Sequence, residues 1–415
     1  MLQTSSHDRA GDLPAENDGM RYRNLIWPFS FYFLFYAGVA AQFPYQVLYF
    51  QSLSFTGAQI GLLAGIAPLI TLVSLPLLTG LADRTNKHKL IMSLSLLAVI
   101  SGLVLFPLLK TFIPFLVLAI LFGVFFSPIT ALADSATIFM LGGKRDLYGR
   151  IRLGGTIGFG IVATVVGALV EDHGLQIAFW SAAGIYFVAF LTSQKLVHGG
   201  EASGASVDRG RASDLLRNPH FVLFLLIGFS GGVSFATINT YLFPYMKELG
   251  AGESMMGLAL TAGTIAEVPV LFFVSRFIKR FRAYAVVVFS LAMTGLRFLL
   301  FAVAPTPGFV LFAQLLNGFN YPLLIVAGVV YADEQAPKGF RATAQGLFGA
   351  ATGGVGAAVG GFAGGLLFES LGAKGMYLVL SVFVGLVLVS VSLVRRALPP
   401  EPEGGPFVSI EAARE

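Results

Sequence analysis

Residues 57–89 read GAQIGLLAGIAPLITLVSLPLLTGLADRTNKHK, an apolar run that ends in a short basic segment. The run carries no charge before Asp83, and roughly 20 apolar residues of helix cross a hydrocarbon core about 30 Å thick. Eleven similar runs leave no room for a soluble domain, and most lack the polar face of a soluble surface helix. We therefore predict an all-α membrane protein of twelve transmembrane helices, near residues 25–50, 58–80, 90–109, 112–139, 151–171, 176–196, 219–246, 254–278, 284–304, 309–333, 343–368 and 374–395.

Positive charges are sorted between the gaps that separate these runs. Every second gap is rich in Lys and Arg, and the six gaps that alternate with these hold only Lys110, Lys247 and Lys374. Because Lys and Arg accumulate in cytoplasmic loops, both termini are predicted to lie in the cytoplasm, at a bacterial inner membrane. Of the 27 Lys and Arg residues, 23 lie in the N-terminal tail, the gaps near 81–89, 142–152, 195–217, 276–282 and 338–341, and the C-terminal tail.

The composition excludes several functional classes. Hydrophobic residues make up 56% of the chain and charged residues 12%, and the formal charge of +5 fits the lipid surface, so no nucleic acid partner is expected. There is no cysteine, which rules out disulfides and thiolate metal sites. The five histidines lie in tails, loops or span edges, and no nucleophile–base set is evident. We expect no enzyme activity, no metal and no cofactor, and a monomer in the bilayer.

The longest polar gap, 197–218, divides the chain into two sets of six spans that resemble each other. The second and eighth spans both end in an Arg/Lys cluster, and the fifth and eleventh are both rich in glycine. Such small residues favour close contact between membrane helices. Repeated halves with a substrate site near the midplane are typical of secondary transporters. The predicted units are a cytoplasmic tail (1–24), a six-helix bundle (25–196), a cytoplasmic loop (197–218), a second bundle (219–396) and a cytoplasmic tail (397–415).

Ionisable residues inside a span are costly and mark candidate functional sites. Asp134 lies in the fourth span and Arg152 opens the fifth, so the two side chains can meet between consecutive antiparallel helices. Glu267 lies in the eighth span next to the helix-kinking Pro269, and Arg297 lies in the ninth as its natural partner. Each pair is interpreted either as a structural ion pair or as a site for substrate or proton binding. Asp134 and Glu267 are the candidate proton carriers.

Uncharged polar residues accompany these charges in the spans. Asn317 and Asn320 are three residues apart and should share one helix face. Such side chains can bind substrate or bridge helices, and both interpretations stay open. The polar residues of this kind are Gln42, Asn239, Thr240, Gln314, Asn317 and Asn320.

The basic segment after the second span, Leu81-Ala82-Asp83-Arg84 followed by Lys87, resembles the loop that is the signature of the major facilitator superfamily. The match is partial, since Thr79 and Asn86 stand where the superfamily has glycine. Asp83 is expected to cap the next helix or a neighbour, where an acid favours the N-terminal dipole. The resemblance implies a gating role for Asp83, Arg84 and Lys87.

Longer stretches resemble the lactose permease group, the oligosaccharide:proton symporters, and its phenylpropionate-permease-like branch. The similarity covers residues 20–396. It is carried by the first span (Phe31-Tyr-Phe-Leu-Phe-Tyr-Ala-Gly), by Tyr148-Gly-Arg-Ile-Arg-Leu-Gly-Gly, by Glu267-Val-Pro, by Arg341-Ala-Thr-Ala-Gln-Gly and by Phe368-Glu-Ser-Leu-Gly.

The resemblance implies a selective set of site residues. The sugar-binding acid and its arginine fall on Asp134 and Arg152, and the ninth-helix arginine falls on Arg297. The family's sugar-stacking tryptophan falls on Phe159. Its tenth-helix histidine and proton-carrying glutamate fall on Asn317 and Asn320, so that coupling pair is absent. The charges of the eleventh and seventh helices are also lost, at Gly353 and near Thr237.

These observations predict a secondary transporter that works by alternating access, most consistent with proton symport of a small organic solute. The solute could be an aromatic or organic acid, a sugar or a nucleoside. In this hypothesis Asp134 and Arg152 hold substrate in the first half, while Glu267 and Arg297 couple the proton in the second. The alternatives are an uncoupled facilitator or exporter of the same fold, and a membrane sensor that binds ligand without net flux.

Overall fold

The computed structural model describes residues 24–142, 147–199, 215–336 and 340–399, and this part of the chain is helical without strands. Most of the predicted tails (1–24, 397–415) and of the inter-half loop (197–218) lies outside the described residues. Eleven helices are long and apolar enough to cross a membrane. The last of them, Arg341–Ala397, holds two spans because Gly372 leaves the helical conformation with φ 67°. The prediction of twelve spans is therefore confirmed.

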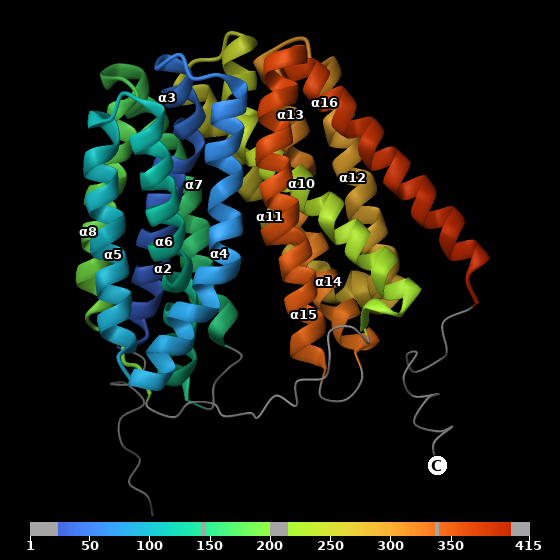
Figure 1. The fold of residues 1–415 in the computed structure, drawn as a ribbon, viewed down its shortest axis with the longest axis horizontal. Coiled ribbons are helices and arrows are strands. Elements are labelled where there is room, and N and C mark those ends of the chain that lie inside the picture. Colours follow the sequence, from blue (N-terminus) through green and yellow to red (C-terminus); the bar gives the residue numbers. More distant parts are fainter. Residues whose placement is uncertain (1–23, 143–146, 200–214, 337–339, 400–415) are drawn as a thin grey trace, which may run out of the picture.

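Two six-span bundles lie side by side and converge at the top of the view in Figure 1. The first half consists of α2 (Ile26–Gln42), η1 (Phe43–Tyr45), α3 (Gln46–Ser52), α4 (Gly57–Thr85), α5 (His88–Leu105), η2 (Phe106–Leu108), α6 (Phe112–Leu141), α7 (Tyr148–His173) and α8 (Gln176–Ser193). The second half consists of α10 (Pro219–Glu248), α11 (Glu253–Phe281), α12 (Ala283–Val303), α13 (Pro307–Gln314), η4 (Leu315–Phe319), α14 (Tyr321–Gln335), α15 (Arg341–Gly349), the π-helix η5 (Ala350–Gly356) and α16 (Ala357–Ala397).

The halves touch where glycines let backbones approach. Against α16, a Cβ on Gly61 would lie 2.7 Å from the Phe362 carbonyl oxygen, and one on Gly365 would lie 2.3 Å from the Gly57 carbonyl oxygen. These contacts lie at the end of the molecule where α4 and α11 begin, which we name the closed end. The opposite end, where α4 reaches its Arg/Lys cluster, is named the basic end.

The second inter-half contact joins α7 to α11, also toward the closed end. A Cβ on Gly257 would lie 2.3 Å from the Ala163 carbonyl oxygen. Thr164 and Thr261 share a hydroxyl hydrogen bond of 2.8 Å across the same contact. The glycine-rich spans therefore serve close helix packing, as the sequence predicts.

Two spans are interrupted rather than continuous. The first changes to a 3₁₀ turn at η1, which contains Pro44, and the tenth changes to the 3₁₀ helix η4 followed by Pro322. The tenth span, predicted near 309–333, is present as Pro307–Gln335, but its centre is not α-helical. Proline removes a backbone donor, so the chain leaves the α-helical hydrogen-bond pattern near these positions. Polar groups are thereby placed at the middle of the bundle.

The signature segment after the second span also differs from expectation. Asp83 and Arg84 lie inside α4, which continues to Thr85 and ends at Asn86 in the left-handed conformation (φ 54°). Asparagine tolerates this conformation where glycine is the usual choice. Asp83 caps none of the helices in the described ranges; its Oδ1 lies 2.8 Å from Nε2 of His88, the first residue of α5. The side-chain contact replaces the expected cap because α4 runs through the predicted loop.

Candidate functional site

A cavity of about 570 Å³ lies between the two halves. Its walls come from α2, η1, α6 and α7 of the first half and from α10–α14 of the second. Eight of the residues singled out from the sequence line it: Arg152, Phe159, Asn239, Glu267, Arg297, Gln314, Asn317 and Asn320. An inter-half cavity of this size suits a small ligand.

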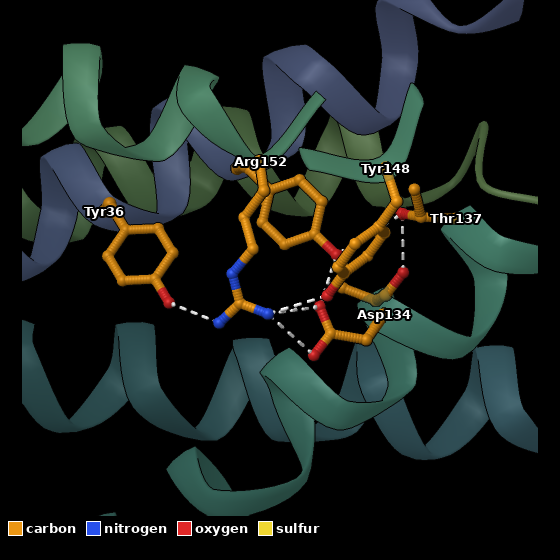
Figure 2. Close-up of polar contacts among 7 residues, drawn as sticks. Tyr36, Asp134, Thr137, Tyr148 and Arg152 are labelled. Atoms are coloured by element: carbon orange, nitrogen blue, oxygen red, sulfur yellow. Dashed lines mark hydrogen bonds and ion pairs between the residues drawn. The ribbon is translucent and has the colours of Figure 1, made fainter. Parts of the chain in front are cut away.

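Arg152 organises the first-half side of the cavity. Its Nη1 lies 3.2 Å from Asp134 Oδ2, so the ion pair expected from the sequence is confirmed. Nη1 also donates to the Tyr148 hydroxyl at 2.7 Å, and Nη2 donates to the Tyr36 hydroxyl at 3.3 Å. Figure 2 shows Arg152 of α7 reaching between Tyr36 of α2 and Asp134 of α6. The guanidinium thus joins three helices at the cavity wall.

Asp134 lies behind Arg152 and is itself held by a second group. The Tyr32 hydroxyl donates to Asp134 Oδ1 at 2.5 Å, and Tyr32 is fully buried. The side chains of Arg152 and Asp134 remain 42% and 29% exposed. This ion pair is therefore open to solvent on the cavity side and fixed on the other.

Arg297 organises the second-half side in a different way. It is only 2% exposed, and its guanidinium faces side-chain amides of the interrupted tenth span. Nη1 donates to Asn317 Oδ1 at 2.6 Å, and Nη2 donates to Gln314 Oε1. Asn320 adds a third amide when its oxygen faces Nη1 at 3.0 Å and its nitrogen donates to the Leu316 carbonyl. The 3₁₀ turn η4 brings all three amides to one arginine.

Glu267 does not pair directly with Arg297, contrary to the expectation from the sequence. Within the described residues no ion pair joins them; Asn317 Nδ2 donates to Glu267 Oε1 at 2.5 Å while its oxygen accepts from Arg297. The reason is geometric, because η4 packs against both α11 and α12 and places Asn317 between them. Asn317 is thus a neutral bridge between a carboxylate and a guanidinium.

Aromatic rings supply much of the remaining wall, and the sequence singled out only Phe159. Phe235 and Tyr321 stack with ring centroids 3.6 Å apart and both line the cavity. Asn239 lines it as well, although its amide nitrogen donates to the Phe235 carbonyl at 2.8 Å. The four-residue spacing of Tyr32 and Tyr36 in the first span was the available signal for the tyrosines around Arg152, since such residues share a helix face.

The residues of the signature segment lie away from the cavity, at the basic end. Arg84 and Lys87 are exposed, and the Asp83 side chain is 59% exposed beside His88. The His88 and His198 rings stack at 5.9 Å, and burial together with the nearby His88 and Lys89 lowers the pKa of His198 to about 4. His198 is therefore neutral near pH 7, and the chain leaving α8 packs against the start of α5.

Comparison with known proteins agrees with this architecture. The model of the MFS_1 like family matches residues 25–379. The chain belongs to this family of the major facilitator superfamily. The relatives that the chain resembles are distant: the maltose permease of Geobacillus stearothermophilus is 28% identical over 382 residues, covering 91% of this chain and 96% of that protein.

A second relative is the xanthosine permease of Escherichia coli (strain K12), 26% identical over 258 residues, which cover 57% of this chain and 62% of that protein. Among solved structures, a mutant of the nucleoside transporter NupG superimposes with a TM-score of 0.80 at 18% identity, over 90% of this chain and 99% of that one. The superfamily expected from the sequence is confirmed, and the chain is an integral membrane transporter of small solutes.

Proposed function

We propose that this transporter is a proton-coupled symporter that imports an uncharged, hydroxyl-bearing ring compound by alternating access. The observation that carries the proposal is the inter-half cavity in which Glu267 is bonded to a neutral amide rather than to a cation. Such a carboxylate can take up a proton without leaving a directly paired cation behind. The proton and the solute are then coupled if both bind more tightly to the same conformation of the transporter.

Glu267 suits the proton better than Asp134 does. Protonation of Asp134 would remove the direct counter-charge of Arg152 and leave the guanidinium without a carboxylate partner at the cavity wall. Protonation of Glu267 instead weakens its hydrogen bond to Asn317, whose other side holds Arg297. The change at the carboxyl is thereby passed to the amide cluster of the tenth span. Arg297 takes part as the far end of this bridge.

The substrate class follows from the charges that face the cavity. While Glu267 is ionised, Arg152 is balanced by Asp134 and Arg297 is balanced across Asn317 by Glu267, so the walls then carry no net charge to attract an organic anion. Amide and hydroxyl groups can bond substrate hydroxyls, and Phe159, Phe235 and Tyr321 offer flat apolar surfaces. The names of the maltose and xanthosine permeases both denote compounds with a hydroxylated sugar ring. A sugar or a nucleoside is therefore preferred over an organic acid.

The proposed roles divide between the halves. Arg152, with Asp134 behind it, and Phe159 bind the solute from the first half, while Asn239 and Asn320 bind it from the second. The signature residues Asp83, Arg84 and Lys87 act at the basic end during gating. The distribution of Lys and Arg supports a cytoplasmic basic end, with both termini in the cytoplasm. The proposed setting is a monomer in a bacterial inner membrane.

The test is uptake into proteoliposomes with an imposed inside-alkaline pH gradient. A radiolabelled panel of disaccharides, nucleosides and phenylpropionate-type acids identifies the solute, and a protonophore should collapse its accumulation. Glu267→Gln keeps the shape but cannot release a proton, so it should only equilibrate the solute while retaining counterflow. Asn239→Ala is the control for solute affinity and should still accumulate at saturating solute. Protonophore-sensitive accumulation by Glu267→Gln would place the proton elsewhere and overturn the proposal.

A further inference from the structure

Two carboxylates cross between the halves at the closed end, outside the cavity. Glu171 comes from the end of α7 in the first half, and Glu369 comes from α16 just before Gly372 in the second. Each reaches the beginning of a helix in the opposite half. Neither residue is used by the transport mechanism proposed above.

Glu171 lies at the start of α11. Its Oε2 accepts a hydrogen bond of 2.8 Å from the backbone N–H of Ser254, the second residue of that helix. Its Oε1 lies 3.0 Å from the position that a Cβ on Gly252 would occupy. Both carboxylate oxygens therefore face the first turn of α11, which has no side-chain cap of its own at Gly252.

Glu369 lies at the start of α4 in the equivalent manner. Its Oε2 accepts a hydrogen bond of 3.3 Å from the backbone N–H of Ala58, again the second residue of the helix. A Cβ on Gly57 would lie 2.5 Å from the Glu369 Cβ, so glycine is what lets the acid approach. The N-cap Thr56 bonds Gln59 and leaves the Ala58 N–H to Glu369.

The two contacts are related by the internal repeat. The acids end the fifth and eleventh spans, and the helices they reach are the second and eighth. Unpaired N–H groups at a helix start favour a negative charge, and hydrogen bonds to a charged acceptor are stronger than neutral ones. Since each bond joins one half to the other, both must break whenever the halves separate at this end.

We propose that Glu171 and Glu369 form a two-point latch that holds the closed end shut, and that their loss shifts the transporter toward the state open at this end. The latch rests on the proposed alternating-access cycle, but not on the identity of the solute or on proton coupling. Lys247 lies near Glu171 and is itself bonded to Glu253 Oε1 at 2.6 Å, so the local cation is already paired within the second half.

Glu248 provides a matched control because it makes the same kind of bond inside one half. Its Oε2 accepts from the backbone N–H of Ala373 at 3.2 Å, at the start of the twelfth span. This bond does not join the two halves. Glu248→Gln should therefore leave the balance between the two conformations unchanged, whereas Glu171→Gln and Glu369→Gln should alter it.

The experiment measures distances by double electron–electron resonance in lipid nanodiscs. The chain has no cysteine, so spin labels attach only at introduced sites. Ser52→Cys with Lys374→Cys reports the closed end, and Thr85→Cys with Phe281→Cys reports the basic end. Each Glu→Gln variant should raise the ratio of long to short closed-end distances roughly two- to fivefold, and the double variant by about the product. Basic-end distances should shorten in step.

A second measurement separates the latch from a general loss of stability. High salt screens exposed charge interactions, so it should lengthen closed-end distances in the parent but not in the double variant. Unchanged distributions in both single variants, or an equal shift in Glu248→Gln, would overturn the latch. If even the parent bound to solute populates one closed-end distance under all conditions, the alternating-access cycle itself is contradicted instead.

Discussion

The two arginines of the cavity are held in opposite ways. Arg152 touches a carboxylate directly and keeps 42% of its side chain exposed. Arg297 is almost fully buried and touches side-chain amides, with its carboxylate one residue further away across Asn317. Both halves thus hold one arginine and one acid, but only in the first half do the two form a direct ion pair.

The difference separates two tasks that an ion pair can perform. In a direct ion pair that faces solvent on one side, both groups stay charged while the side facing the cavity binds and releases the solute. A bridged pair lets the acid change its charge state while the arginine keeps neutral acceptors. The first half would then bind the solute and the second half would respond to the proton. Variants that turn a bridged pair into a direct one should change these roles accordingly.

The largest effect is expected from removing the buried arginine. Arg297→Leu leaves Asn317 and Gln314 without their common donor and Glu267 without the cation across Asn317. Losing one side of a buried charged network costs about 3–5 kcal/mol. Arg152→Leu removes a solvent-screened pair and should cost about 1 kcal/mol. SDS titrations monitored by circular dichroism measure the unfolding free energy of both variants. Equal losses would mean that the two sites do not differ in burial as described.

An intermediate effect is expected from making the second half resemble the first. Asn317→Asp places a carboxylate where Arg297 now meets an amide oxygen, so a direct ion pair should replace the bridge. Glu267 then loses its amide donor, and proton-driven accumulation should fall roughly tenfold. Uptake at several external pH values measures this, with Asn239→Asp as the control for adding a negative charge to the cavity. Retained accumulation in Asn317→Asp alone would show that the bridge does not carry coupling.

The smallest effect is expected from trimming the first-half site. Tyr148→Phe removes one acceptor of Arg152 but leaves its pair with Asp134 intact. A single such hydrogen bond contributes about 0.5–1.5 kcal/mol, so the half-saturation constant should rise roughly two- to tenfold. Initial uptake rates measure it, and Tyr241→Phe, which loses a bond to the Gly361 carbonyl instead, should leave the constant unchanged. A changed maximal rate with the same constant would argue against a positioning role.

The sequence was sufficient for features that depend on local pattern. Hydrophobic length predicted the twelve spans, and the cost of burying charge predicted that Asp134 would meet Arg152, because consecutive antiparallel helices leave few alternatives. The sequence was insufficient to predict side-chain contacts at the place where α11, α12 and η4 meet. Asn317 separates Glu267 from Arg297 only because the tenth span changes to a 3₁₀ helix there, and Pro322 alone did not indicate how far the change extends.

The polar residues outside the membrane core were the least predictable. The sequence analysis did not single out Glu171 or Glu369, since nothing in the neighbouring sequence identifies a partner in the other half. Asp83 was expected to cap a helix because the signature segment looked like a loop, but α4 continues through it. Which donor an exposed acid reaches depends on how the halves pack, and that information is not present in any short stretch of sequence.

The π-helix η5 is a place where the eleventh span can twist about its own axis. Its seven residues, Ala350–Gly356, are wound more widely than the α-helices on either side. Rewinding them by one residue into regular α-helix would rotate α15 by roughly 100° about the span axis, the share of one residue in a 3.6-residue turn. Gly360 and Gly365 could keep their contacts meanwhile, because the twist is absorbed before them. The α15 end of this span can therefore rotate about the span axis while the end that carries Gly360 and Gly365 keeps its position.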